Sequence, residues 1–162
     1  MILTALTAIV LDEKPLSLLT LRFGHAQGDT CKAWMLALEA GGHRFFVPEI
    51  ADYELRRELI RANKGPSLAR LDAFNAAEPD RYRPLTTPDV REAARLWAQA
   101  RAPKNNTGGA PKEALDGDVL IAAQALRLVP AGLGLADVVV ATGNVSHLSR
   151  LAPSALWSDI RP

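Results

Sequence analysis

The segment DVVVA at residues 137–141, together with AIVL at residues 8–11, decides the fold. Three consecutive valines do not alternate with polar residues, as they would in a strand with one face in water. An unbroken apolar run of this length, rich in β-branched residues, is typical of a strand that helices cover on both faces. The first run ends abruptly at Asp12. These two segments predict the central strands of a mainly parallel sheet.

The rest of the chain alternates between predicted strands and predicted helices. Further strands are expected at residues 44–47, 82–85 and 156–157. Helices are expected at residues 30–40, 50–62, 68–74, 87–101 and 118–126, with Thr30 and Thr87 as caps of the first and fourth. Residues 103–117 predict a loop. This order predicts an α/β fold, a three-layer α/β/α arrangement with a mainly parallel central sheet, in one domain over residues 1–162.

Composition excludes several classes of protein. With 162 residues, 48% apolar and 23% charged, the chain matches an ordinary soluble domain with one core. Cys31 is the only cysteine, which excludes an internal disulfide and a cysteine-rich zinc site and fits a reducing cytoplasm. No apolar run is long enough to cross a bilayer, so no membrane association is expected. The net charge of +1 shows no overall electrostatic preference for nucleic acid.

Acidic residues follow the predicted strands and precede the last one. In a parallel sheet the carboxyl ends of the strands form the crevice that binds ligands, so these acids are expected at one rim. Carboxylates forced together raise one another's pKa unless a cation neutralises them. Ligands with oxygen only favour Mg²⁺ or Mn²⁺, which suit phosphodiester hydrolysis. The side chains expected at this rim are Asp12, Glu49, Glu54, Asp116, Asp118 and Asn144.

Each candidate also has an ordinary structural explanation. Asp12 fits the first residue of a turn, and Glu54 fits a surface pair with Arg57 or Arg61. Asp116 and Asp118 compete to cap one helix, which leaves one of them without that role. The basic stretch of Arg56, Arg57 and Arg61 fits contacts to RNA phosphates, but equally a solvated helix face. His25, His43 and His147 show no ligand spacing and are expected to be solvated or hydrogen-bonded surface histidines.

Three segments resemble the motifs of the PIN-domain family, and especially its VapC-like toxins. IVLDEK resembles the family's first strand and acid and places that acid at Asp12. IADYELRREL resembles the helix that carries the second acid and selects Glu54 over Glu49. DVLIAAQAL, from Asp118, resembles the third motif, which leaves Asp116 as an outer acid or a cap. The resemblance spans nearly the whole chain.

The fourth motif departs from the family pattern. The family has a segment like VTRD after the last strand, whereas this chain has VATGN, with Thr142 at the hydroxyl position and Asn144 at the place of the acid. Glu13 and Lys14 also replace the small polar residues that usually follow the first acid. Asparagine still coordinates through its carbonyl oxygen, but the loss of one negative charge lowers the expected affinity for a divalent ion.

The resemblance implies a function for these residues. It implies a cytoplasmic, metal-dependent endoribonuclease, the toxin of a bacterial type II toxin–antitoxin pair, in which Asp12, Glu54 and Asp118 bind Mg²⁺ or Mn²⁺ and Asn144 assists. The metal ligands would be oriented by residues that do not touch the ion, namely Thr142, Asp116 and Glu49. RNA would be bound by Arg56, Arg57 and Arg61. The resemblance further implies products with a 5′-phosphate, inhibition by a small antitoxin protein, and a homodimer.

Two alternatives to an active nuclease follow from the same residues. The altered LDEK and TGN motifs fit a degenerate PIN-like module that binds RNA or a protein partner without cutting. A phosphate-accepting receiver domain also gathers acids at strand ends, but it needs an acceptor aspartate after a central strand and a lysine after the last one. Neither residue stands at the expected place in this chain, so the PIN-like alternative is the stronger of the two.

Overall fold

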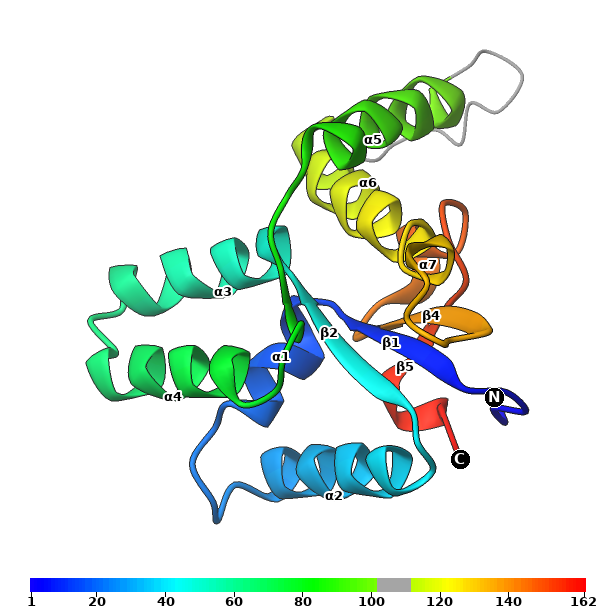
Figure 1. Cartoon of the computed structure of the whole chain (residues 1–162). Helices are drawn as coiled ribbons and strands as arrows, with labels where there is room; N and C mark the ends of the chain where they lie inside the picture. The colour runs from blue at the N-terminus through cyan, green and yellow to red at the C-terminus, as the bar shows by residue number, and fades with distance from the viewer. Residues whose placement is uncertain (102–111) are drawn as a thin grey trace.

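The strands form one sheet in which every neighbouring pair is parallel. The computed structural model describes residues 1–101 and 112–162. The strands are β1 (Thr7–Leu11), β2 (Arg44–Pro48), β3 (Tyr82–Arg83), β4 (Asp137–Thr142) and β5 (Ser154–Leu156), in the spatial order β3-β2-β1-β4-β5. Both segments that decided the fold, β1 and β4, lie side by side at its centre (Figure 1). The predicted α/β class with a parallel sheet is confirmed.

Helices lie on both faces of this sheet (Figure 1). They are α1 (Glu13–Leu19), α2 (Ala26–Ala40), α3 (Glu49–Arg61), α4 (Gly65–Ala76), α5 (Thr87–Ala100), α6 (Lys112–Leu126) and α7 (Val145–Leu148), with short 3₁₀ turns η2 (Val129–Ala131) and η3 (Trp157–Asp159). One face packs against α5, α6 and α7, and the other against α1, α2, α3 and α4. None of the helices in the described ranges is long and apolar enough to span a membrane.

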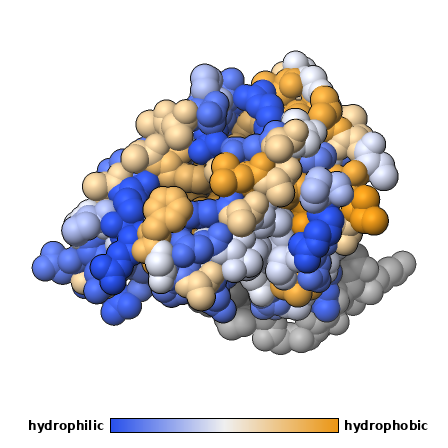
Figure 2. Space-filling view, turned by 90° about the horizontal axis from the view of Figure 1, so that it is seen from below, coloured by the Kyte–Doolittle hydropathy of each residue, from blue (hydrophilic) through white to orange (hydrophobic). Residues whose placement is uncertain are grey.

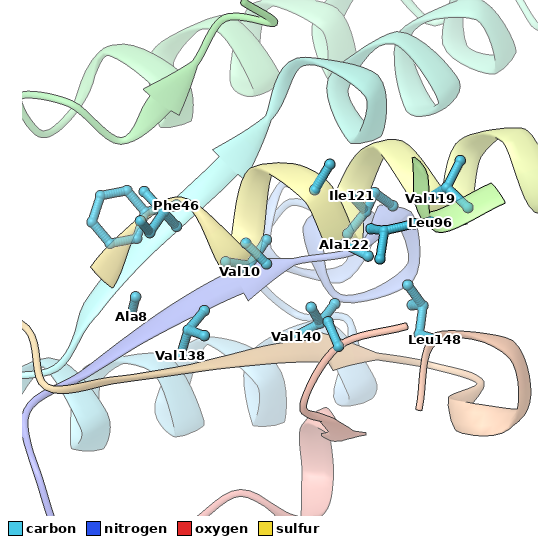
Figure 3. Packing of buried hydrophobic residues seen from close by; sticks show 14 of the residues in the cluster. Ala8, Val10, Phe46, Leu96, Val119, Ile121, Ala122, Val138, Val140 and Leu148 are labelled. Atoms are coloured by element: carbon cyan, nitrogen blue, oxygen red, sulfur yellow. The ribbon is translucent and has the colours of Figure 1, made fainter. Parts of the chain in front are cut away.

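The central strands divide their side chains between these two faces. Val10 and Val140 pack with α6 in one core (Figure 3), whereas Ile9 and Val139 point the opposite way into the second core. All four side chains have no exposed surface. Burial on both faces is the reason that these strands lack polar alternation. On the side seen from below, polar and apolar residues are mixed (Figure 2), as expected of an ordinary solvent-facing surface.

Helix starts account for three differences from the predictions. Thr86, one residue earlier than expected, caps α5 in a reciprocal capping box with Asp89. The α2 helix begins at Ala26 with His25 as its cap, so the prediction of Thr30 as the cap is wrong, and its hydroxyl bonds the Ala26 carbonyl instead. The predicted loop 103–117 is wrong for residues 112–117, which belong to α6, and residues 103–111 lie outside the described part.

Candidate functional site

Asp12 leaves β1 at the carboxyl edge of the sheet, where two bonds hold its carboxylate. Its Oδ1 accepts a hydrogen bond of 2.7 Å from the Glu13 amide, which caps α1. Its Oδ2 accepts a hydrogen bond of 2.5 Å from the Thr142 hydroxyl. Leu11 pairs with Ala141 across the sheet, so the parallel register brings Asp12 and Thr142 together. The orientation of the Asp12 side chain is therefore set by the sheet itself.

Glu54 reaches the same region from α3. A Cβ atom added to Gly117 would lie 2.5 Å from Glu54 Oε1, so the carboxylate rests directly on the backbone of α6. Gly117 immediately precedes Asp118, and this contact brings Glu54 beside the third predicted acid. An alanine at position 117 would displace the carboxylate. Helix propensity disfavours glycine inside α6 by about 1 kcal/mol relative to alanine, so this close approach is its evident structural use.

The three acids act on one another electrostatically. Burial and the charge of Asp12 raise the pKa of Asp118 to about 6, against an ordinary value of 3.8. Burial also raises the pKa of Glu54, with further contributions from Asp12, Asp118 and Glu13 that exceed the opposing effect of Arg57. Asp12 is thus a shared source of repulsion for both partners. Together the three carboxylates form a local negative charge that the surrounding cations do not fully balance.

His147 is a basic side chain that contacts Asp118. Its Nδ1 lies 3.4 Å from Asp118 Oδ2, and this contact lowers the pKa of Asp118 in opposition to burial and repulsion. The expectation that the three histidines are solvated or hydrogen-bonded surface residues is wrong for His43, which is buried. His147 is half-buried against Asp118, His43 is buried and accepts a bond from the Thr7 amide, and His25 caps α2. The one sequence signal for His147 is its position shortly after the last predicted central strand, at the edge where the acids lie.

Asn144 lies close to the site but is engaged in a cap. Its Oδ1 accepts bonds from the Ser146 amide and the Ser146 hydroxyl, at 3.1 and 2.9 Å, and so begins α7. Its own amide donates to Thr142 Oγ1 at 3.0 Å. The carbonyl oxygen that was expected to assist metal binding therefore already accepts hydrogen bonds at the start of α7. The hydroxyl of Thr142 links this turn to Asp12.

Lys14 lies across the same turn. A Cβ atom on Gly143 would come within 2.7 Å of Lys14 Cγ and 2.9 Å of its Cβ, so the stem of the lysine packs against the Gly143 backbone. Burial and the charge of Asp12 raise the pKa of neighbouring Glu13, and the Lys14 ammonium opposes this rise. The glycine of the TGN motif and the lysine of the LDEK motif are therefore a contacting pair. The two departures from the family pattern lie together.

The carboxylates suit a metal ion chemically, although their side chains do not converge on a single point. Their oxygens are the hard ligands that Mg²⁺ and Mn²⁺ prefer, and their mutual repulsion is what a bound cation would relieve. Within the described ranges, however, no three His, Cys, Asp or Glu side chains lie close enough to hold one ion. Asp12, Glu54 and Asp118 are the side chains whose chemistry suits such an ion.

The remaining predicted acids lie outside this group. Glu49 Oε2 accepts a hydrogen bond of 2.6 Å from the Leu85 amide, and so ties the start of α3 to the segment after β3. Asp116 is exposed and lines a shallow pocket between α5 and α6 with Trp97 and Leu120. Neither residue contacts Asp12, Glu54 or Asp118 through any observed hydrogen bond in the described part of the chain. Their structural roles lie elsewhere.

The three arginines proposed for RNA binding differ in availability. Arg56 binds Asp52 through two hydrogen bonds and Asp72 through a third, and is therefore committed to the fold. Arg61 pairs with Glu58 on the surface, where its side chain is 77% exposed. Arg57 lies over the ring of Tyr53, with its guanidinium carbon 5.5 Å from the ring centroid. Arg57 is thus an arginine whose charge acts on Glu54 and that lacks an ion-pair partner among the described residues.

Comparisons with known proteins identify the fold. No protein-family model matches the sequence, and no curated protein matches it significantly. A solved structure does match: a chain of VapBC2 from Rickettsia felis, crystallised with a DNA fragment from its promoter, with a TM-score of 0.62. The match covers 93% of this chain and 98% of the other at 15% sequence identity. The chain therefore has a PIN-like fold, as its motifs predict.

Proposed function

We propose that this chain is a metal-dependent endoribonuclease, the toxin of a two-protein toxin–antitoxin pair. The observation that carries the proposal is the grouping of Asp12, Glu54 and Asp118, in which burial and the charge of Asp12 raise the pKa of both other acids. Such an arrangement costs folding free energy and is typical of functional sites rather than structural ion pairs. The position of Asp12 at the carboxyl end of β1, on the edge of a parallel sheet where ligands usually bind, supports the proposal.

Each residue has a defined part in the proposed reaction. Asp12, Glu54 and Asp118 would hold Mg²⁺ or Mn²⁺, which when bound neutralises phosphoryl charge and lowers the pKa of an attacking water. The Thr142 hydroxyl and the Glu13 amide fix the orientation of Asp12 before substrate arrives. Glu54 would also accept the proton of the attacking water through the carboxylate oxygen that does not hold the ion. Hydrolysis would leave a 5′-phosphate on the RNA product.

The experiment is cleavage of labelled single-stranded and structured RNA by the purified full-length chain. We expect cleavage with Mn²⁺ or Mg²⁺, none with EDTA, and a loss of about a hundredfold or more in Asp118→Asn. Asp137→Asn is the matched control, because Asp137 is exposed at the opposite edge of the sheet. Equal cleavage by wild type and Asp118→Asn would contradict the proposal. Calorimetric titration with Mn²⁺ alone tests the metal site separately.

A second candidate is a PIN-like module that binds RNA or protein without cutting it. The contact between His147 and Asp118 favours this candidate, because a protonated histidine would supply the positive charge that a metal ion otherwise brings. The use of the Asn144 oxygen in capping α7 favours it as well. RNA binding by a protein that neither cleaves RNA nor takes up Mn²⁺ would decide for this candidate.

A partner protein and self-association belong to the same proposal. The similar chain from Rickettsia felis was crystallised within VapBC2. We infer by that likeness that a small antitoxin protein binds this chain and covers the acids, and that the chain forms a homodimer. Light scattering of the purified protein tests the dimer, and inhibition of RNA cleavage by a co-expressed neighbouring gene product tests the antitoxin.

A further inference from the structure

Tyr53 is exposed directly beside the acidic site. It is 55% exposed and precedes Glu54 on α3. A single exposed aromatic residue is common on protein surfaces and by itself indicates nothing. Two further observations distinguish Tyr53. One is its cationic neighbour Arg57, and the other is the position of both side chains around Glu54.

These three side chains share one face of α3. Tyr53 and Arg57 are four residues apart and Glu54 and Arg57 are three apart, which are the spacings that bring helical side chains into contact. The Arg57 guanidinium lies over the Tyr53 ring, and its charge also acts on Glu54. Unlike Arg56 and Arg61, it has no ion pair in the part of the chain that the structure describes. An aromatic ring and a free cation therefore lie at the rim of the acids.

We infer that Tyr53 and Arg57 form a platform that binds one unpaired RNA base and its phosphate next to the bond that is cut. The inference rests on the proposed ribonuclease function and names its substrate class as single-stranded RNA. A base stacks on the open face of the Tyr53 ring, while Arg57 donates hydrogen bonds to the adjoining phosphate. Bases in a duplex are already stacked and cannot reach the ring, so the platform selects unpaired RNA.

The test measures RNA binding without cleavage. Single-stranded RNA that carries the fluorescent base 2-aminopurine is titrated with the full-length protein in EDTA, and the same RNA annealed to its complement serves as the duplex. Stacking on tyrosine quenches the fluorescence of the unpaired base. We expect Tyr53→Ala to abolish this quenching and to weaken binding of the single strand about tenfold, with duplex binding unchanged. Tyr53→Phe retains the ring and should retain both properties.

Ile60→Ala is the matched control, because Ile60 is 61% exposed on the same helix. It should bind single-stranded RNA like the wild type. Wild-type affinity in Tyr53→Ala, or an equal loss for single strand and duplex, would overturn the platform. The two proposals can fail separately. If the protein never cleaves RNA but still quenches the fluorescence in a way that depends on Tyr53, the platform is supported and the nuclease is rejected. Cleavage that is unchanged in Tyr53→Ala rejects the platform alone.

Discussion

Helix α3 carries two carboxylates, Asp52 and Glu54, whose surroundings are opposite. Asp52 is buried and accepts bonds from Arg56 at 2.8 and 2.9 Å and from Asn75 at 2.8 Å. Glu54 lies two residues away and faces three other acids, and only Arg57 opposes their repulsion. The first carboxylate joins α3 to α4 and stabilises the fold. The second lies where its charge is unfavourable, which supports the proposal that function rather than stability has determined the residues of this region.

The largest expected effect is on catalysis and comes from Glu54. We expect Glu54→Gln to lower kcat/KM for RNA cleavage by about a hundredfold or more, because the amide cannot accept the proton of water. Thermal stability should be unchanged or higher, since a repelled charge is removed. Steady-state cleavage rates and thermal unfolding of the same samples measure the two effects.

Gly117→Ala tests the same carboxylate without changing its chemistry. The added Cβ would lie 2.5 Å from Glu54 Oε1 and would push the side chain away from its place. We expect a fall of about fivefold to tenfold in kcat, smaller than that of Glu54→Gln, because the carboxylate is still present. If Gly117→Ala cleaved RNA as fast as the wild type, the position of Glu54 on α6 would have no catalytic importance.

The next effect is on stability and comes from Asp52. We expect Asp52→Ala to lower the free energy of unfolding by about 2–3 kcal/mol, since it leaves Arg56 and Asn75 without their buried acceptor. The retained bond between Arg56 and Asp72 places the loss at the lower end of the range for a broken buried pair. Urea unfolding measures the change. The control is Glu58→Ala, which breaks an exposed pair with Arg61 and should cost less than about 1 kcal/mol.

The sequence predicted the sheet well because burial on both faces leaves a direct pattern in β1 and β4. It also selected Asp12, Glu54 and Asp118, because each lies at an element end or within a resembled motif. It did not separate Asp52 from Glu54, since the partners of Asp52 stand at position 56 and on another helix, at position 75. The contact of His147 with Asp118 is equally invisible, because it depends on how α7 packs against α6. Side-chain partners across elements exist only in the folded chain.

A smaller effect on stability is expected from Asp118, and it depends on pH. The pKa of Asp118 in the folded protein, about 6, lies above its ordinary value of 3.8. The folded state therefore holds the proton more tightly than the unfolded state, and stability falls as the pH rises from about 4 through 6. Asp118→Asn removes this loss, but also the contact of the carboxylate with His147. We expect a gain of about 1–2 kcal/mol at pH 8 and almost none at pH 4, measured by urea unfolding in EDTA. A gain that did not change with pH would show that charge is not its cause.

The smallest expected effect concerns Lys14, which interacts with its neighbouring acid differently from Arg56. Arg56 neutralises Asp52 through paired hydrogen bonds of fixed geometry, whereas the stem of Lys14 lies on Gly143 and its ammonium acts on Glu13 only through charge. A positive charge beside the acids repels a divalent cation, but solvent weakens this repulsion at an exposed side chain. We therefore expect Lys14→Met to raise the affinity for Mn²⁺ by only about twofold, and high salt to remove the difference. Calorimetric titration at two salt concentrations measures both. An increase of a hundredfold would mean that the ammonium occupies the cation's own position, and that Lys14 balances the acids as directly as Arg56 balances Asp52.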